Sequence, residues 1–181
     1  MNTREVAVTA IFVATAVAGR IALAFIPNVS LAFPVIFLSA ILFGYKIGGV
    51  VGFLTYIISD LYLGPGPWTI INASLAALVG MLTGLLRFKI VSDKFILFTS
   101  VVLLTLFFDI SSSVLSMSLF GVSPIIAIIG LFMPIFIGFI PYPMGPVHEI
   151  TNGILTILLT HNLQKNHLIL RYLGVSCYGD E

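Results

Sequence analysis

Charged side chains are scarce in this sequence, and cysteine is nearly absent. Only 8% of the 181 residues are charged and 59% are hydrophobic, whereas about a quarter of a typical soluble domain is charged. The net charge of +1 provides no basic face for a nucleic-acid partner. The single cysteine, Cys177, excludes an internal disulfide. We therefore predict one integral domain in the lipid bilayer of the cell membrane that binds no nucleic acid.

Helix breakers and charges divide the chain into seven apolar segments, several of them shorter than the roughly 20 residues of a simple crossing. Residues 124–139 are predicted to form a shallow helix that does not cross, because the breaker-rich stretch 140–146 follows it. The predicted fold class is therefore all-α, a bundle of six transmembrane helices with an extra short apolar helix near the outer face. The predicted spans are 6–25, 29–44, 47–63, 68–86, 95–120 and 147–163, followed by a cytoplasmic tail at 164–181.

The basic residues orient this bundle. If the N-terminus is cytoplasmic, six crossings place seven of the eight Lys and Arg residues on the cytoplasmic side, as the positive-inside rule requires. A seventh crossing would move Lys165 and Arg171 to the outside. The protein is therefore predicted to be multi-pass, with both termini in the cytoplasm.

The first span carries two features that lipid contact alone does not explain. Ala10, Ala14, Ala18 and Ala22 share one helix face, against which a helix of another protein could pack closely. Tight packing within this protein is the alternative. The same span contains Arg20, whose guanidinium is costly in a membrane unless it faces a wet cavity or a carboxylate, so we predict that Arg20 belongs to a site.

Polar side chains gather in the predicted outer half of the bundle. Asp109 lies deep in the fifth span, and we expect it to bind a ligand or an ion or, alternatively, to form a structural salt bridge with Arg20. Trp68 either anchors the chain at the interface or closes over a ring-bearing ligand. The predicted substrate-binding residues, which share this half, are Arg20, Asn28, Asp60, Trp68, Asn72, Asp109, His148, Glu149 and Asn152.

The last span opens with a sequence close to the zinc-protease motif His-Glu-x-x-His. Asn152 replaces the second histidine, and a tetrahedral zinc site requires at least three protein ligands, so no metal site is predicted. His148 and Asn152 instead share one helix face at the outer mouth, with Glu149 beside them. We predict no cofactor.

Together these features resemble the substrate-binding S components of energy-coupling factor (ECF) transporters, the prokaryotic vitamin importers. The matching features are six helices in about 180 residues, Ala10, Ala14 and Ala18, Pro27-Asn28-Val29, the Gly-Pro-Gly-Pro-Trp-Thr loop at 64–69 and the His-x-x-x-Asn opening at 148–152. The resemblance implies that outer helix ends and loops hold a vitamin, and that the subunit topples to release it inside. It also implies that the alanine face docks on the transmembrane T component, which couples to two cytoplasmic ATPases.

The substrate class and two competing functions stay open at this point. The outer half has a net negative charge, because it contains three carboxylates and one arginine, and this favours a cationic or donor-rich vitamin or vitamin precursor. Two of the loops are most similar to those of S components of unassigned or cobalamin-related specificity. The first competing function is an intramembrane enzyme in which His148 and Glu149 form an acid–base pair. The second is a small structural membrane protein whose polar residues pair only among themselves. We predict a binding subunit rather than an enzyme.

Overall fold

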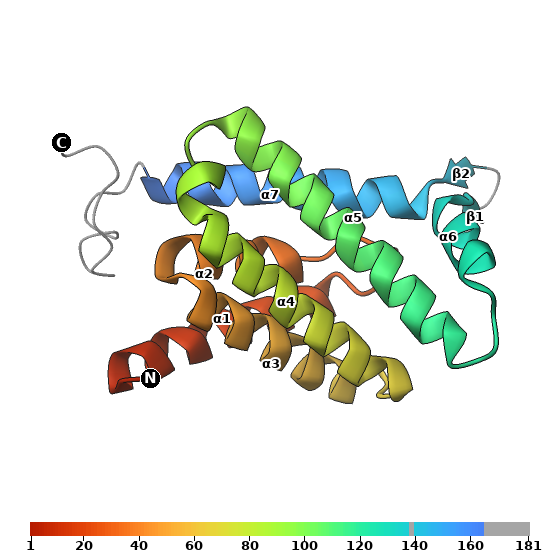
Figure 1. The fold of residues 1–181 in the computed structure, drawn as a ribbon, viewed down its shortest axis with the longest axis horizontal. Coiled ribbons are helices and arrows are strands. Elements are labelled where there is room, and N and C mark those ends of the chain that lie inside the picture. Colours follow the sequence, from red (N-terminus) through yellow and green to blue (C-terminus); the bar gives the residue numbers. More distant parts are fainter. Residues whose placement is uncertain (138–139, 165–181) are drawn as a thin grey trace.

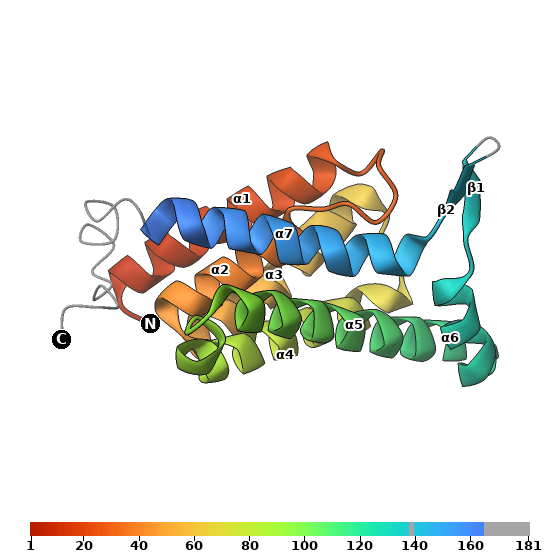
Figure 2. The same ribbon diagram turned by 90° about the horizontal axis from the view of Figure 1, so that it is seen from above.

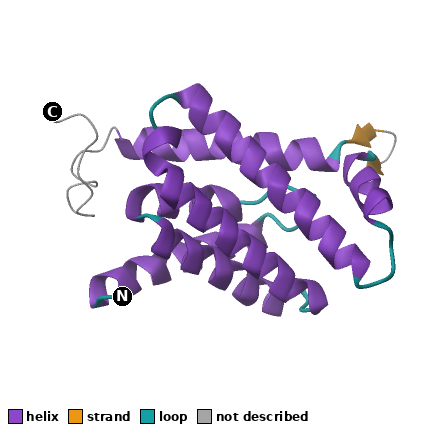
Figure 3. Ribbon diagram, viewed as in Figure 1, coloured by secondary structure: helices purple, strands orange, loops and turns teal. Residues whose placement is uncertain are grey.

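Seven helices and one short β-hairpin make up the described part of the chain (Figure 1; Figure 3). The computed structural model describes residues 1–137 and 140–164, so Cys177 and nearly all of the predicted tail lie outside the described residues. The elements are α1 Thr3–Ala22, α2 Ala32–Phe43, α3 Tyr45–Leu63, α4 Pro67–Ile90, α5 Lys94–Ser118, α6 Pro124–Phe132, β1 Ile135–Ile137, β2 Ile140–Tyr142 and α7 Met144–Gln164. Apart from the hairpin, the predicted all-α class is confirmed.

The segment predicted as one helix over 124–139 is divided into two parts. Helix α6 ends at Phe132, because Pro134 lacks the N–H that would continue the helix and disfavours helical backbone in the residue before it. Strand β1 follows and pairs antiparallel with β2, so the second half of that prediction is wrong. The Tyr142 hydroxyl donates a hydrogen bond to the Pro27 carbonyl at 2.7 Å, which ties the hairpin to the α1–α2 connection.

Four helices, α1, α3, α4 and α5, are long and apolar enough to cross a membrane. Helix α2 is shorter than its predicted span of 29–44 because it begins only at Ala32, and its 12 residues make about 18 Å of helix. Residues 32–40 of α2 are all buried, so neighbouring helices surround it. The count of six crossings stays a prediction.

The connections between helices alternate between two ends of the bundle (Figure 1; Figure 2). The α1–α2 and α3–α4 connections lie at the end that carries α6, here called the α6 end. The α2–α3 and α4–α5 connections lie at the opposite end with the start of α1 and the end of α7. That opposite end, here called the basic end, carries Arg4, Lys46, Arg87, Lys89 and Lys94.

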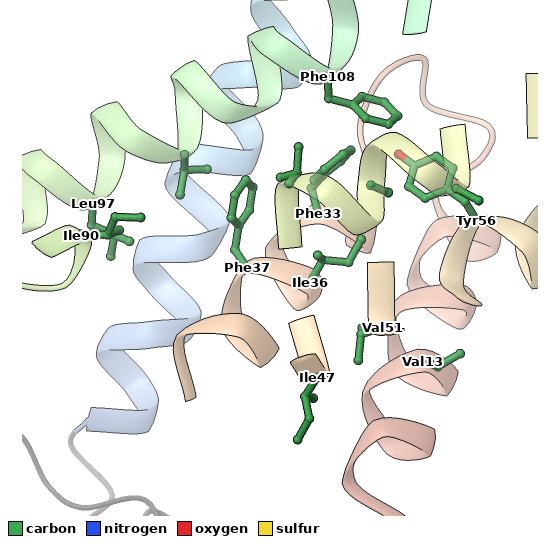
Figure 4. Packing of buried hydrophobic residues seen from close by; sticks show 14 residues of the cluster. Val13, Phe33, Ile36, Phe37, Ile47, Val51, Tyr56, Ile90, Leu97 and Phe108 are labelled. Atoms are coloured by element: carbon green, nitrogen blue, oxygen red, sulfur yellow. The ribbon is translucent and has the colours of Figure 1, made fainter. Parts of the chain in front are cut away.

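Helix α2 lies at the centre of the apolar core (Figure 4). Its residues Phe33, Ile36 and Phe37 are fully buried and pack in one cluster with Val51 of α3 and Leu97 of α5. The core therefore forms around a short helix that its neighbours enclose.

Helices α3 and α4 approach each other through glycine. A Cβ atom added at Gly80 would lie 2.2 Å from the carbonyl oxygen of Gly48, and one added at Gly52 would lie 2.3 Å from that of Ala76. Backbone atoms cannot move aside as a flexible side chain can, so only glycine permits this crossing.

We expect Gly80→Ala to lower the melting temperature of the detergent-purified protein, because overpacking against a backbone carbonyl costs about 1–3 kcal/mol. Gly130→Ala is the matched control, because nothing lies within 4 Å of the added methyl group. Thermal unfolding of both variants measures the difference. Equal melting temperatures would show that α3 and α4 are not in backbone contact.

Candidate ligand-binding site

Arg20 connects α1 to the α6 end of α3. Its Nη1 atom donates hydrogen bonds to the Ser59 hydroxyl and to Asp60 Oδ1, the second at 2.5 Å. The guanidinium carbon lies 4.3 Å from the centre of the Tyr56 ring, within cation–π range. The charge of Arg20 is therefore matched by a carboxylate and faces the bundle interior, as a membrane span requires.

Asp109 and His148 form the second buried pair and connect α5 to α7. His148 Nδ1 lies 2.7 Å from Asp109 Oδ2 and 3.0 Å from Oδ1. The alternative of an Asp109–Arg20 salt bridge is wrong, because each residue pairs on a different helix. Asp109 faces His148 of α7, whereas Arg20 faces Asp60 of α3.

Phe33, Tyr56 and Phe108 form an aromatic cluster (Figure 4) that contacts both pairs. The ring centres of Phe33 and Phe108 are 4.7 Å apart, and those of Tyr56 and Phe108 are 5.3 Å apart. The ring centres of Phe33 and His148 are 5.7 Å apart, and the Arg20 guanidinium lies over the Tyr56 ring. Aromatic rings thus meet the Arg20–Asp60 ion pair and the hydrogen-bonded Asp109–His148 pair in one place.

Sequence reasoning did not identify these three aromatic residues as part of the site. A phenylalanine within an apolar helix usually belongs to the core, and nothing in its own neighbourhood marks it otherwise. The available signal was spacing, because Tyr56 lies one helical turn before Asp60 and Phe108 directly precedes Asp109.

Several predicted site residues carry buried polar atoms without a hydrogen-bond partner within residues 1–137 and 140–164. These atoms are Asp60 Oδ2, Asn72 Oδ1, Glu149 Oε1 and both polar side-chain atoms of Asn152. A buried polar atom without a partner costs about 1–3 kcal/mol, so each such atom calls for an explanation. A polar ligand bound here would supply the missing partners.

The two remaining predicted site residues lie at the α6 end. Asn28 follows α1 in a left-handed conformation with φ of 55°. Trp68, 37% exposed at the start of α4, packs on Phe120 with ring centres 6.5 Å apart. The described residues contain no group of three or more His, Cys, Asp and Glu side chains that could hold a metal ion.

The alanine face of α1 is exposed. Thr9, Val13, Ala16 and Gly19 form the opposite, buried face of the same helix. The exposed residues at intervals of four are Ala10, Ala14, Ala18 and Ala22. Within the described chain, the alternative of internal packing for this face is therefore wrong.

A family model described as "ECF-type riboflavin transporter, S component" matches residues 1–165. No curated protein and no solved structure matches the chain in the same comparisons. The match extends over all of the helices and the hairpin described above.

We expect Asp60→Ala to destabilise the protein by about 3 kcal/mol or more, because it leaves the partly buried Arg20 charge without its carboxylate. The double variant Arg20→Met/Asp60→Leu removes both charges and should recover most of that loss. Thermal unfolding in detergent of Arg20→Met, Asp60→Leu and the double variant measures the coupling, and Asp60→Ala measures the loss of the carboxylate alone. Additive losses would show that the pair does not hold α1 on α3.

Proposed function

Because the chain belongs to the family of ECF-type riboflavin transporter S components, we propose that it captures riboflavin at the α6 end for an ATP-driven importer. The family is a membrane transporter component and not an enzyme, which removes the support for an acid–base role of His148 and Glu149. The expectation of a cobalamin-related cargo is likewise not supported, because the family is of riboflavin type.

The observation that carries the proposal is the combination of flat rings and unpartnered polar atoms at one end of the bundle. Riboflavin has a planar aromatic ring system with donors and acceptors on its edge, and a chain of hydroxyl groups. Phe33, Tyr56 and Phe108 offer ring faces and edges for such a system. Asp60 Oδ2 and Glu149 Oε1 are buried acceptors, which suit the imide N–H and the hydroxyl groups of this neutral but donor-rich vitamin.

The partner half of the proposal rests on the exposed face of α1. Its small side chains allow the backbone of a second helix to come close, which is how helices associate where lipid surrounds them. We assign this face, Ala10, Ala14, Ala18 and Ala22, to docking on the transmembrane T component. Two cytoplasmic ATPases joined to that component would supply the energy.

We expect Asn152→Leu to weaken riboflavin binding at least tenfold, because the substitution removes both the donor and the acceptor that the ligand would meet. Asn162→Leu, the same change at an exposed position near the end of α7, is the matched control. Quenching of flavin fluorescence on titration of the purified protein measures both affinities. Unchanged affinity in Asn152→Leu would place the vitamin elsewhere.

We expect Ala14→Trp to abolish riboflavin uptake and co-purification with the T component while riboflavin affinity in detergent stays within about twofold. The indole would hold the second helix away from α1, yet Ala14 faces out of the bundle. Ser74→Trp places the same side chain on an exposed position of α4 and should leave uptake intact. Normal uptake by Ala14→Trp would exclude docking through this face.

A further inference from the structure

Threonine hydroxyls in this bundle fall into two groups. Those of Thr9, Thr83 and Thr151 donate to the carbonyl oxygen four residues earlier, at 2.6–2.8 Å, which is how a helix ordinarily satisfies them. The buried threonines Thr55 of α3, Thr105 of α5, and Thr156 and Thr160 of α7 behave differently, because none of these hydroxyls has a hydrogen-bond partner within the described ranges. Thr105 and Thr156 are the fully buried ones on the two helices that the Asp109–His148 pair joins. Their hydroxyls are thus available to a group from outside the fold.

The packing of α5 on α7 brings these hydroxyls into line with the ligand site. The two helices run in opposite directions and are joined by the Asp109–His148 pair (Figure 2). Leu97 and Thr160, each about three turns from that pair toward the basic end, line one shared cleft, which fixes the register of the two helices. Thr105, one turn from Asp109, therefore lies level with Asn152, one turn from His148.

Asn152, Thr105 and Thr156 thus form a row that leads from the ligand site toward the middle of the bundle. On α7 the row extends about 12 Å beyond His148, because eight residues at about 1.5 Å each separate His148 from Thr156. All three members are fully buried and have unpartnered polar atoms. None carries a charge, and a threonine hydroxyl or an asparagine amide both donates and accepts hydrogen bonds. Such a row suits neutral hydroxyl groups rather than a phosphate or a carboxylate.

We propose that Thr105, Asn152 and Thr156 form a polyol subsite that takes the hydroxyl chain of the ligand, while the ring system binds at Phe33 and Tyr56. This inference rests on the riboflavin function proposed above. Ordered water offers the same hydroxyl chemistry, and the experiment below separates the two. This row favours riboflavin over flavins that have no hydroxyl chain, because such a flavin would leave the polar atoms of the row without partners.

The test compares riboflavin with lumiflavin, which has a methyl group in place of the hydroxyl chain. We expect the wild-type protein to bind riboflavin more tightly than lumiflavin. Thr156→Val should weaken riboflavin binding about five- to tenfold, the effect of one hydrogen bond, and leave lumiflavin binding within twofold. Thr83→Val, which removes an equally buried hydroxyl that donates to the Val79 carbonyl within α4, is the matched control and should change neither affinity. Fluorescence titration of purified protein measures all six affinities.

Melting of the ligand-free protein distinguishes a ligand subsite from a water site. Valine has the shape of threonine, so Thr156→Val should raise the melting temperature by removing an unpartnered hydroxyl. A lower melting temperature together with unchanged affinity for both flavins would assign the row to ordered water and overturn the subsite. Equal weakening of both flavins would overturn it too. Thr105→Val provides the same comparison if Thr156→Val does not fold. A wild-type protein that binds neither flavin would overturn the proposed riboflavin function itself.

Discussion

The bundle depends on the pairing of Arg20 with Asp60. A guanidinium inside an apolar bundle is tolerated only when a carboxylate faces it, so this contact decides how α1 sits against α3. The requirement is strong here because α1 buries only a narrow stripe, Thr9, Val13, Ala16 and Gly19, and leaves its alanine face open. One polar contact at the α6 end therefore helps to hold a helix whose alanine face is exposed.

The residues of the proposed ligand site lower the stability of the fold. Asp60, Glu149 and Asn152 bury polar atoms without partners in the described chain, although an apolar core of the same size would avoid that cost. Proteins depart from such packing rules chiefly where a function requires it. The unpartnered polar atoms are confined to a few positions. The aromatic residues beside them, Phe33, Tyr56 and Phe108, pack in the apolar core like its other members.

The sequence predicted the general chemistry of the site better than its contacts. Spacing alone placed the four alanines on one face and His148 next to Asn152, because helical periodicity follows directly from residue number. It could not decide whether Arg20 faces Asp60 or Asp109, since hydropathy does not determine which helices are neighbours. The prediction of one helix over 124–139 overlooked Pro134, which ends α6. The β-hairpin that follows depends on pairing between segments that are not periodic.

Helix α2 has a consequence for how the protein is made. Its 12 residues are too few to bridge a bilayer core of about 30 Å, and its buried sides are covered by other helices rather than by lipid. Gly44 alone separates it from α3. During biogenesis the enclosure of α2 is therefore complete only after α4 and α7 have been synthesised, because both pack against it.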